Sequence, residues 1–214
     1  MESHILASQL RRPNGEEASE VAQKMNEANR ALNLKCIELL QLRASESLLE
    51  IGPGNGAFVA DILSMASDIS YMGLDWSPDM VEEAKRLNEH LVEQGCAQFQ
   101  QGSSEQLPFE ASTFNKVLTV HTLYFWKNPG DHLAEIRRVM KPNSLFCIAF
   151  GDRAFMKDLP FVPYGFNLYD CAEVCALLRS CGFQIVDTYQ HKESGLSNTG
   201  EHVDKVINII TSKV

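Results

Sequence analysis

The chain has 214 residues, of which 44% are hydrophobic, enough to build the core of one α/β domain. Its formal net charge of −9 gives no long-range attraction to phosphates, and its basic residues are scattered, which argues against a nucleic-acid partner. The first residues include an acid and no sustained apolar run, and no stretch approaches the length of a membrane span. We therefore expect a soluble, cytoplasmic, single-domain protein.

The N-terminal segment precedes the core of the domain. Residues 1–15 are predicted to form a polar arm that ends in a turn at Pro13-Asn14-Gly15. Over residues 21–39, apolar side chains recur at three- and four-residue steps, which predicts one long amphipathic helix, or two with a break near Asn33. Residues 1–45 thus form a helical cap segment. It either closes over the strand ends, with the stretch Met25–Asn29 above the ligand, or packs there for stability alone.

A glycine-rich turn is the main motif of the sequence. The apolar run Leu48–Ile51 breaks into three alternating glycines, Gly52, Gly54 and Gly56, and resumes as a helix over about residues 56–66. Glycine lets the backbone turn sharply and approach a ligand that a Cβ atom would push away. The helix start offers free N–H groups and a positive dipole end. We expect a nucleotide-like cofactor here rather than a glycine turn with no ligand.

The next elements continue a βαβ pattern. A second apolar stretch, residues 69–74, ends at Asp75, about 20 residues after the glycines, the distance at which a βαβ unit brings a carboxylate to ribose hydroxyls. A helix over residues 78–94 has Ser77 as its N-cap and proline at its first position. Residues 97–102 are expected to form a third strand.

The remaining pattern predicts a doubly wound sheet that ends in a hairpin. We expect strands at residues 114–120 and 145–150, and helices at 131–140 and 170–180, capped by Asp131 and Asp170 and bounded by the Pro129-Gly130 and Lys141-Pro142-Asn143 turns. Strands 183–191 and 203–213, joined by a polar loop from Glu193 to Gly200, have no helix between them, which predicts an antiparallel edge hairpin.

Residues 151–169 fit no regular element and are crowded with aromatic side chains. Such a loop either forms an apolar wall of a binding site or folds under as a satellite core. The fourth strand ends at His121. In this architecture the reaction takes place at the carboxyl ends of the strands, so we expect catalytic residues there.

Six cysteines are candidates for disulfides or metal ligands: Cys36, Cys96, Cys147, Cys171, Cys175 and Cys181. In an intracellular chain of this size we expect them to be reduced and mostly buried. Cys171, Cys175 and Cys181 are close enough for a metal or arsenic-like ligand set, but no Cys-x-x-Cys pair or histidine at ligand spacing supports one. We predict no metal site.

At the glycine turn the sequence resembles the class I S-adenosylmethionine-dependent methyltransferases. Glu50-Ile51-Gly52-x-Gly54-x-Gly56 matches their first motif and Gly73-Leu74-Asp75 their second, and the segment Ser103–Phe109 resembles the one that places the adenine ring. The resemblance covers residues 46–214 and is strongest to the small-molecule branch ("type 11") that includes quinone-biosynthesis enzymes. It implies a Rossmann-like α/β fold with a seven-stranded sheet, the cofactor S-adenosylmethionine, and a small-molecule methyl acceptor. Neither the acceptor nor the oligomeric state is indicated.

The resemblance also implies a set of cofactor contacts. The glycines bring backbone to the amino acid part of the cofactor, Asp75 takes the ribose hydroxyls, Glu50 holds the turn or the ammonium group, and Trp76 and Met80 contact the adenine. The expected cofactor-binding residues are Glu50, Gly52, Pro53, Gly54, Gly56, Asp75, Trp76, Met80, Ser103, Ser104, Glu105, Val120 and His121.

One position departs from the family. Where it often has an aspartate that accepts a hydrogen bond from the adenine, this chain has Ser103, a neutral acceptor. Charge-assisted hydrogen bonds are about twice as strong as neutral ones. We therefore expect either a weaker cofactor contact or a larger share of it for Ser104 and Glu105.

The catalytic residues are less determined than the cofactor site. The sulfonium already activates the methyl group, so alignment of the acceptor is the protein's main task and a base is optional. If a proton must leave, His121 is the best-placed base and Tyr124 the second candidate, although the phenol suits orientation of the acceptor better. His121 alternatively is a satisfied structural group beside the cofactor.

Two other functions fit part of the sequence. Gly52-x-Gly54-x-x-Ala57 also satisfies the looser dinucleotide fingerprint of a nicotinamide-dependent oxidoreductase, but the Ser103–Phe109 segment and the terminal hairpin have no role in that interpretation. A non-catalytic S-adenosylmethionine-binding module is the other alternative, because Ser103 and the unproven base leave activity open.

Overall fold

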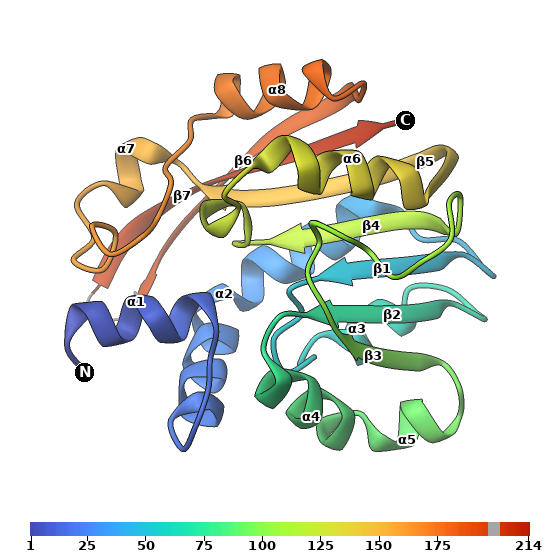
Figure 1. The fold of residues 1–214 in the computed structure, drawn as a ribbon, viewed down its shortest axis with the longest axis horizontal. Coiled ribbons are helices and arrows are strands. Elements are labelled where there is room, and N and C mark those ends of the chain that lie inside the picture. The colour runs from blue at the N-terminus through green and yellow to red at the C-terminus, as the bar shows by residue number, and fades with distance from the viewer. Residues whose placement is uncertain (197–201) are drawn as a thin grey trace.

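The computed structural model describes residues 1–196 and 202–214. Its strands are β1 (Ser47–Ile51), β2 (Ser70–Asp75), β3 (Ala97–Gln101), β4 (Phe114–Val120), β5 (Met140–Gly151), β6 (Gln184–Leu196) and β7 (His202–Lys213). They form one sheet in the order β3-β2-β1-β4-β5-β7-β6, in which β1 to β5 are parallel and β7 is antiparallel to both neighbours (Figure 1). The predicted seven-stranded, doubly wound sheet with an antiparallel C-terminal hairpin is confirmed.

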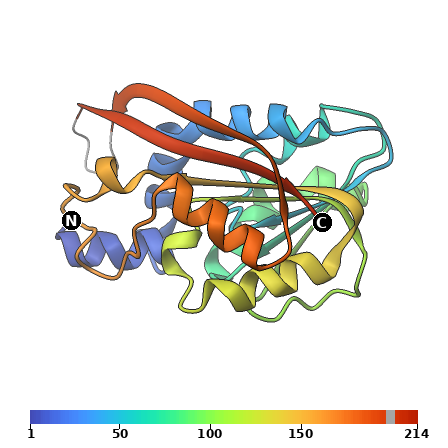
Figure 2. The same ribbon diagram turned by 90° about the horizontal axis from the view of Figure 1, so that it is seen from above.

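Helices cover both faces of the sheet (Figure 2). One face carries α2 (Ala18–Leu40), α3 (Val59–Leu63), α4 (Pro78–Leu87) and α5 (Glu89–Glu93), and the other carries α6 (Pro129–Val139) and α8 (Cys171–Ser180). The shorter elements α1 (Ser3–Arg11), η1 (Leu123–Phe125) and α7 (Arg153–Met156) complete the described helices. Both faces of the central strands are therefore buried, as parallel sheets require.

The strand side chains alternate between two cores. Leu49 and Val117 pack with the apolar residues of α6 and α8, whereas Leu48 and Leu118 pack with α2, α3 and α4. All four side chains are almost completely buried. This period of two sets which strand residues reach the helices and which backbone ends face the crevice above the sheet.

The order of the strands reverses between β1 and β4, and this switch point positions the site. Ile51 at the end of β1 pairs with Leu74 on one side and with Thr119 on the other. The turn after β1 therefore emerges between the ends of β2 and β4, and α1 and the first half of α2 lie over these ends (Figure 1). Ligands of open α/β sheets bind in this crevice.

Several local predictions were wrong. Residues 1–15, predicted as a polar arm, contain the helix α1, which packs against the core and buries Leu6 and Ala7. At α1, tertiary burial outweighs the weak local signal. The alternative of a single long helix is confirmed for α2, which is continuous through Asn33, and the Asn33 side chain donates to the Asn29 carbonyl at 2.9 Å within the helix.

The helix expected over residues 78–94 is divided. Asn88 separates α4 from α5 because its side-chain amide donates to the carbonyls of Ala84 and Gly56, at 2.9 and 3.1 Å. An asparagine that bonds nearby backbone in this way competes with the helix. Helix α3 is also shorter than predicted and begins only at Val59.

The boundaries around β5 differ as well. Helix α6 starts at Pro129, which takes the first helical position instead of forming a turn, and β5 begins at Met140, so that the expected stop Lys141-Pro142-Asn143 lies within a strand. The short helix α7 interrupts the segment 151–169. Of the predicted loop from Glu193 to Gly200, residues 193–196 belong to β6 and the rest lies outside the described residues. Within the described ranges, no helix combines the length and apolarity needed to cross a bilayer.

Candidate functional site

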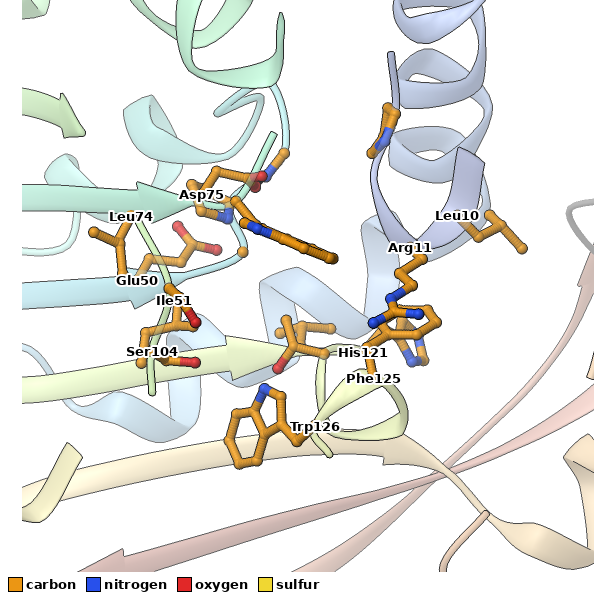
Figure 3. A pocket seen from close by; sticks show the side chains of 18 of the residues that line it. Leu10, Arg11, Glu50, Ile51, Leu74, Asp75, Ser104, His121, Phe125 and Trp126 are labelled. Atoms are coloured by element: carbon orange, nitrogen blue, oxygen red, sulfur yellow. The ribbon is translucent and has the colours of Figure 1, made fainter. Parts of the chain in front are cut away.

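A cavity of about 430 Å³ lies above the switch point, within the range of small-molecule sites. Figure 3 shows Glu50 and Asp75 on one side of it, at the strand ends, with Leu10 and Arg11 on the opposite side. Of the expected cofactor-binding residues, those that line it are Glu50, Gly52, Pro53, Gly54, Asp75, Trp76, Ser103, Ser104, Glu105, Val120 and His121. Tertiary structure thus brings together segments from the ends of four strands, β1, β2, β3 and β4.

Two expected residues lie outside the lining. A Cβ on Gly56 would come within 2.9 Å of the Asn88 side chain and 3.0 Å of the Phe99 ring, so this glycine allows close packing under the turn. Met80 is fully buried and packs with Ala18 and Ala22 of α2.

Two glycines give the turn its shape. Gly52, at φ +75°, passes so close to Thr122 that a Cβ atom would lie 2.5 Å from the threonine methyl. Gly54, at φ +57°, borders the cavity, and a Cβ there would meet no atom within 4 Å. A side chain at Gly52 would clash with the protein, whereas one at Gly54 would extend into open space at a conformation that favours glycine. The backbone at Gly54 is therefore free for close approach by a ligand.

The carboxylate of Asp75 links β2 to the glycine turn. It accepts hydrogen bonds from the backbone N–H groups of Gly54 at 3.0 Å and Ser77 at 2.8 Å. Burial raises the pKa of Asp75 to about 6, and these backbone donors oppose the rise. At neutral pH the group is mainly ionised and is held in position as an acceptor for hydroxyl groups.

Glu50 is a buried carboxyl at the end of β1, with 6% of its surface exposed. The Tyr71 hydroxyl donates to it at 2.7 Å. Burial raises the pKa of Glu50 to about 7, the Tyr71 hydrogen bond opposes this, and the charge of Asp75 adds to it. An acid withdrawn from water beside an open cavity suits a cationic group of a ligand, which would favour its ionised form.

A histidine and a tryptophan support the Ser103–Glu105 segment. Nδ1 of His132 lies 2.7 Å from the Ser104 hydroxyl, and the imidazole stacks on Trp126 with ring centroids 4.7 Å apart and planes at 6°. His132 Nε2 is buried 3.4 Å from Glu105 Oε1, without a hydrogen bond among the described residues. Burial lowers the pKa of His132, and Glu105 opposes the shift. The Ser103 hydroxyl accepts from the Glu105 N–H at 3.3 Å.

His121 follows β4 in a left-handed conformation, with φ +59°. Its Nδ1 lies 2.9 Å from the Tyr124 hydroxyl, which in turn accepts a hydrogen bond from the Gly151 N–H. Burial, together with the charge of Lys205, lowers the pKa of His121 to about 4. Burial raises the pKa of the Tyr124 phenol far above its ordinary value. Both side chains are therefore neutral at physiological pH.

The N-terminal helices form one wall of the cavity and are bonded to α4. Ser77 Oγ donates to the Pro13 carbonyl, and the Gly15 N–H donates to the Asp79 carboxylate at 2.7 Å. The Trp76 ring, 44% exposed, has the guanidinium carbons of Arg11 and Arg12 at 5.2 and 4.8 Å from its centroid.

A smaller cavity of about 90 Å³ adjoins the first. The two share Leu10, Met25, Asn29, His121 and Phe125. The smaller one is closed by the aromatic segment, through Phe155, Met156, Leu159, Phe161 and Phe166, and by Ala28, Tyr124, Lys205 and Ile207. The predicted apolar wall is therefore present, and Phe161 also packs into the core.

The sequence did not identify many lining residues. The unanticipated ones are Leu10, Arg11, Pro13, Asn33, Ile51, Phe58, Leu74, Gly102, Thr122, Phe125, Trp126, Lys127 and His132. Proximity to the end of β4 is a signal for Trp126. Arg11 lies on α1 and His132 on α6, and nothing in the local sequence of either residue indicates that it lines the cavity.

The six cysteines are free thiols; Cys36, Cys147 and Cys175 are buried and the other three are partly exposed. In the described parts of the chain, no three His, Cys, Asp or Glu side chains are grouped as metal ligands.

Comparisons with known proteins agree in pointing to one family. The family model described as "Methyltransferase domain" matches residues 49–148. An uncharacterized methyltransferase of Bacillus subtilis, YdaC, is 30% identical over 125 residues, which cover 58% of this chain and 67% of that protein. An O-methyltransferase of Pyrenophora dematioidea is 28% identical over 122 residues, 57% of this chain and 45% of the other.

Among solved structures, an S-adenosylmethionine-dependent methyltransferase from Aquifex aeolicus matches with a TM-score of 0.71 and 17% identity. The match covers 91% of this chain and 96% of that chain. At this identity the likeness shows the fold alone.

Proposed function

Because the chain belongs to the class I S-adenosylmethionine-dependent methyltransferases, we propose that its larger cavity binds this cofactor and that it methylates a small-molecule acceptor mainly by alignment. The observation that carries the proposal is the open backbone at Gly54 beside two carboxylates, the buried Glu50 and the half-buried Asp75. None of the relatives described above supports a nicotinamide-dependent oxidoreductase.

The residues present fit the parts of the cofactor. Asp75, ionised and fixed by two N–H donors, offers acceptor atoms to the ribose hydroxyls. Glu50 offers a carboxylate to the ammonium group, and the Gly52–Gly54 backbone admits the amino acid part. On the adenine side we assign Trp76, Val120 and the Ser103–Glu105 segment, with Trp126 and His132 as additional support. Gly56 and Met80 shape the turn and the helix beneath it.

The bound cofactor supplies a methyl group on a sulfonium, activated for in-line displacement. The chain must hold an acceptor in line with that methyl and exclude water. His121 is neutral at pH 7 and has one nitrogen engaged by Tyr124, but with its pKa at about 4 it is a weak proton acceptor. This favours alignment over strong base catalysis, with Tyr124 orienting the imidazole.

The acceptor is a small molecule, and the N-terminal segment 1–45 acts as a cap. Support for the cap comes from Arg11, Met25, Asn26 and Asn29, which line the cavity from α1 and α2. Six unpaired thiols are typical of a reducing compartment, so we place the protein in the cytoplasm.

Calorimetry with S-adenosylmethionine and its demethylated product tests the cofactor assignment. Asp75→Ala removes the carboxylate that accepts hydrogen bonds from the ribose hydroxyls. Because a hydrogen bond to a charged group contributes about 1.5–3 kcal/mol, the variant should bind both ligands at least tenfold more weakly. Asp61→Ala, outside both cavities, should bind normally. No binding to the unmodified protein at millimolar ligand, or equal binding by Asp75→Ala, would refute the assignment.

A further inference from the structure

The smaller cavity adjoins the proposed cofactor site and is lined on its far side by the aromatic segment. We propose that it is an acceptor subsite for a compound with a single aromatic ring and a hydroxyl group, that is, a phenol. This proposal rests on the proposed methyl transfer, and it adds the substrate class. Its supports are the size of the cavity, the chemistry of its walls and the polar groups where the two cavities meet.

The size limits the occupant to about one ring. The cavity measures about 90 Å³. An engineered protein cavity of about 150 Å³ lined by Leu, Ile and Phe holds one benzene molecule. The smaller cavity has less volume than that one, so a single ring is the largest unit that it can take, and any substituent must extend into the larger cavity that it adjoins. A sterol or a long acyl chain would not fit within this space.

The walls favour an aromatic ring over a saturated one. Phe166 is the centre of the aromatic cluster, with ring centroids 4.8 Å from Phe125, 5.2 Å from Phe161 and 5.6 Å from Tyr124. These rings are tilted against one another by 38° to 65°. Aromatic pairs in such arrangements contribute beyond the area that they bury. A phenol ring would add another aromatic pair to this cluster, whereas a saturated ring such as that of cyclohexanol would not.

The polar groups lie where the two cavities meet. His121 and Asn29 border both cavities, so a hydroxyl placed between them faces the cofactor side. Since Nδ1 of His121 is engaged by Tyr124, its Nε2 is the nitrogen left to meet an acceptor hydroxyl.

A cation completes this environment. Lys205 borders the smaller cavity and is bonded to Glu193 at 3.0 Å and to the Ala28 carbonyl. Its charge lowers the pKa of His121, and the charge of Glu193 opposes this shift. A cation here favours a developing phenolate, and its ion pair with Glu193 reduces the effect.

The transfer balances without a further reactant. The phenol oxygen forms a bond to the methyl carbon as the carbon–sulfur bond of the sulfonium breaks, and the sulfur keeps the electron pair as a neutral thioether. The hydroxyl group donates a hydrogen bond to His121 Nε2, in the tautomer that carries the imidazole proton on Nδ1, and the hydroxyl proton is released to water as the new bond forms. The products are an aryl methyl ether and the demethylated cofactor.

The test uses phenol as the probe and cyclohexanol as its saturated counterpart, each titrated into the full-length protein saturated with S-adenosylhomocysteine. We expect phenol to bind at least about tenfold more tightly, and incubation with S-adenosylmethionine to yield anisole. Equal binding of the two alcohols, or phenol binding without any anisole, would overturn the proposal. Failure of S-adenosylhomocysteine to bind would instead refute the cofactor assignment, so the two failures are distinguishable.

Matched variants locate the subsite. Ala28→Ile adds bulk to the cavity from α2, and Ala31→Ile makes the same change on the exposed face of that helix. Phenol affinity should fall at least tenfold in Ala28→Ile and stay within twofold in Ala31→Ile, with S-adenosylhomocysteine affinity unchanged in both. Phe166→Leu, which removes a ring without filling the cavity, should abolish the preference for phenol over cyclohexanol. Unchanged phenol binding in both Ala28→Ile and Phe166→Leu would place the phenol elsewhere and overturn the subsite.

Discussion

Replacement of Glu50 by glutamine tests whether a binding residue is held at a cost to stability. The carboxyl is 6% exposed, and burial raises its pKa from the ordinary 4.5 to about 7. A shift of that size corresponds to about 3 kcal/mol, since one pKa unit is about 1.4 kcal/mol. The side chain is thus stable as the neutral acid and unfavourable as the anion. Glutamine keeps an oxygen for the Tyr71 hydroxyl and carries no charge at any pH.

The direction with pH follows from proton binding. The folded protein binds the Glu50 proton more tightly than the unfolded chain, so this group stabilises the fold below pH 4.5 and loses its contribution as pH rises through 7. Glu50→Gln should therefore be within about 1 kcal/mol of the unmodified protein at pH 5 and more stable by about 2–3 kcal/mol at pH 8. At this chain length, that is a rise of roughly 4–12 °C in melting temperature.

Urea unfolding of both proteins at pH 5 and pH 8 measures the difference, and calorimetry at pH 8 should show weaker cofactor binding by the variant. Glu93→Gln, which removes an exposed carboxylate at the end of α5, is the control and should show no gain that depends on pH. A difference between Glu50→Gln and the unmodified protein that is equal at the two pH values, or a loss of stability at pH 8, would refute the reasoning.

Three further predictions concern the cap, the base and the adenine contact. Deletion of residues 1–17 removes α1 and the contacts of the following turn with α4. If the segment is a cap, release of S-adenosylhomocysteine in stopped-flow measurements should become at least about tenfold faster. An unchanged rate with a lower melting temperature would mean that the segment only packs for stability. His121→Gln and His121→Ala should lower kcat by less than about 10²-fold with cofactor affinity unchanged, because a weak base contributes little, and a larger loss in both would show base catalysis. Ser103→Asp should tighten cofactor binding by roughly two- to tenfold in calorimetry, since it restores a charged acceptor, and unchanged affinity would show that Ser103 makes no adenine contact.

The sequence alone determined the features that depend on short, fixed spacings. The step from Leu48–Ile51 into alternating glycines, and the distance from there to Asp75, place a turn and a carboxylate at adjacent strand ends, because a βαβ unit has a nearly constant length. The terminal hairpin was readable for a similar reason, since two strands without a helix between them can only pair antiparallel as neighbours along the chain.

Only the tertiary structure decided which distant side chains complete the site. Arg11, Trp126 and His132 line one cavity from different parts of the chain. The sequence pattern within each of these segments does not indicate that the three side chains lie close together. The same holds for α1. Its sequence gives only a weak helical signal, and the packing of Leu6 and Ala7 against the core stabilises the helix. The charge states of Glu50 and His121 also depend on burial by remote segments. The residue type fixes which chemical group is present. The packing of the whole chain decides how far that group is removed from water and which groups contact it, and these two factors determine its pKa.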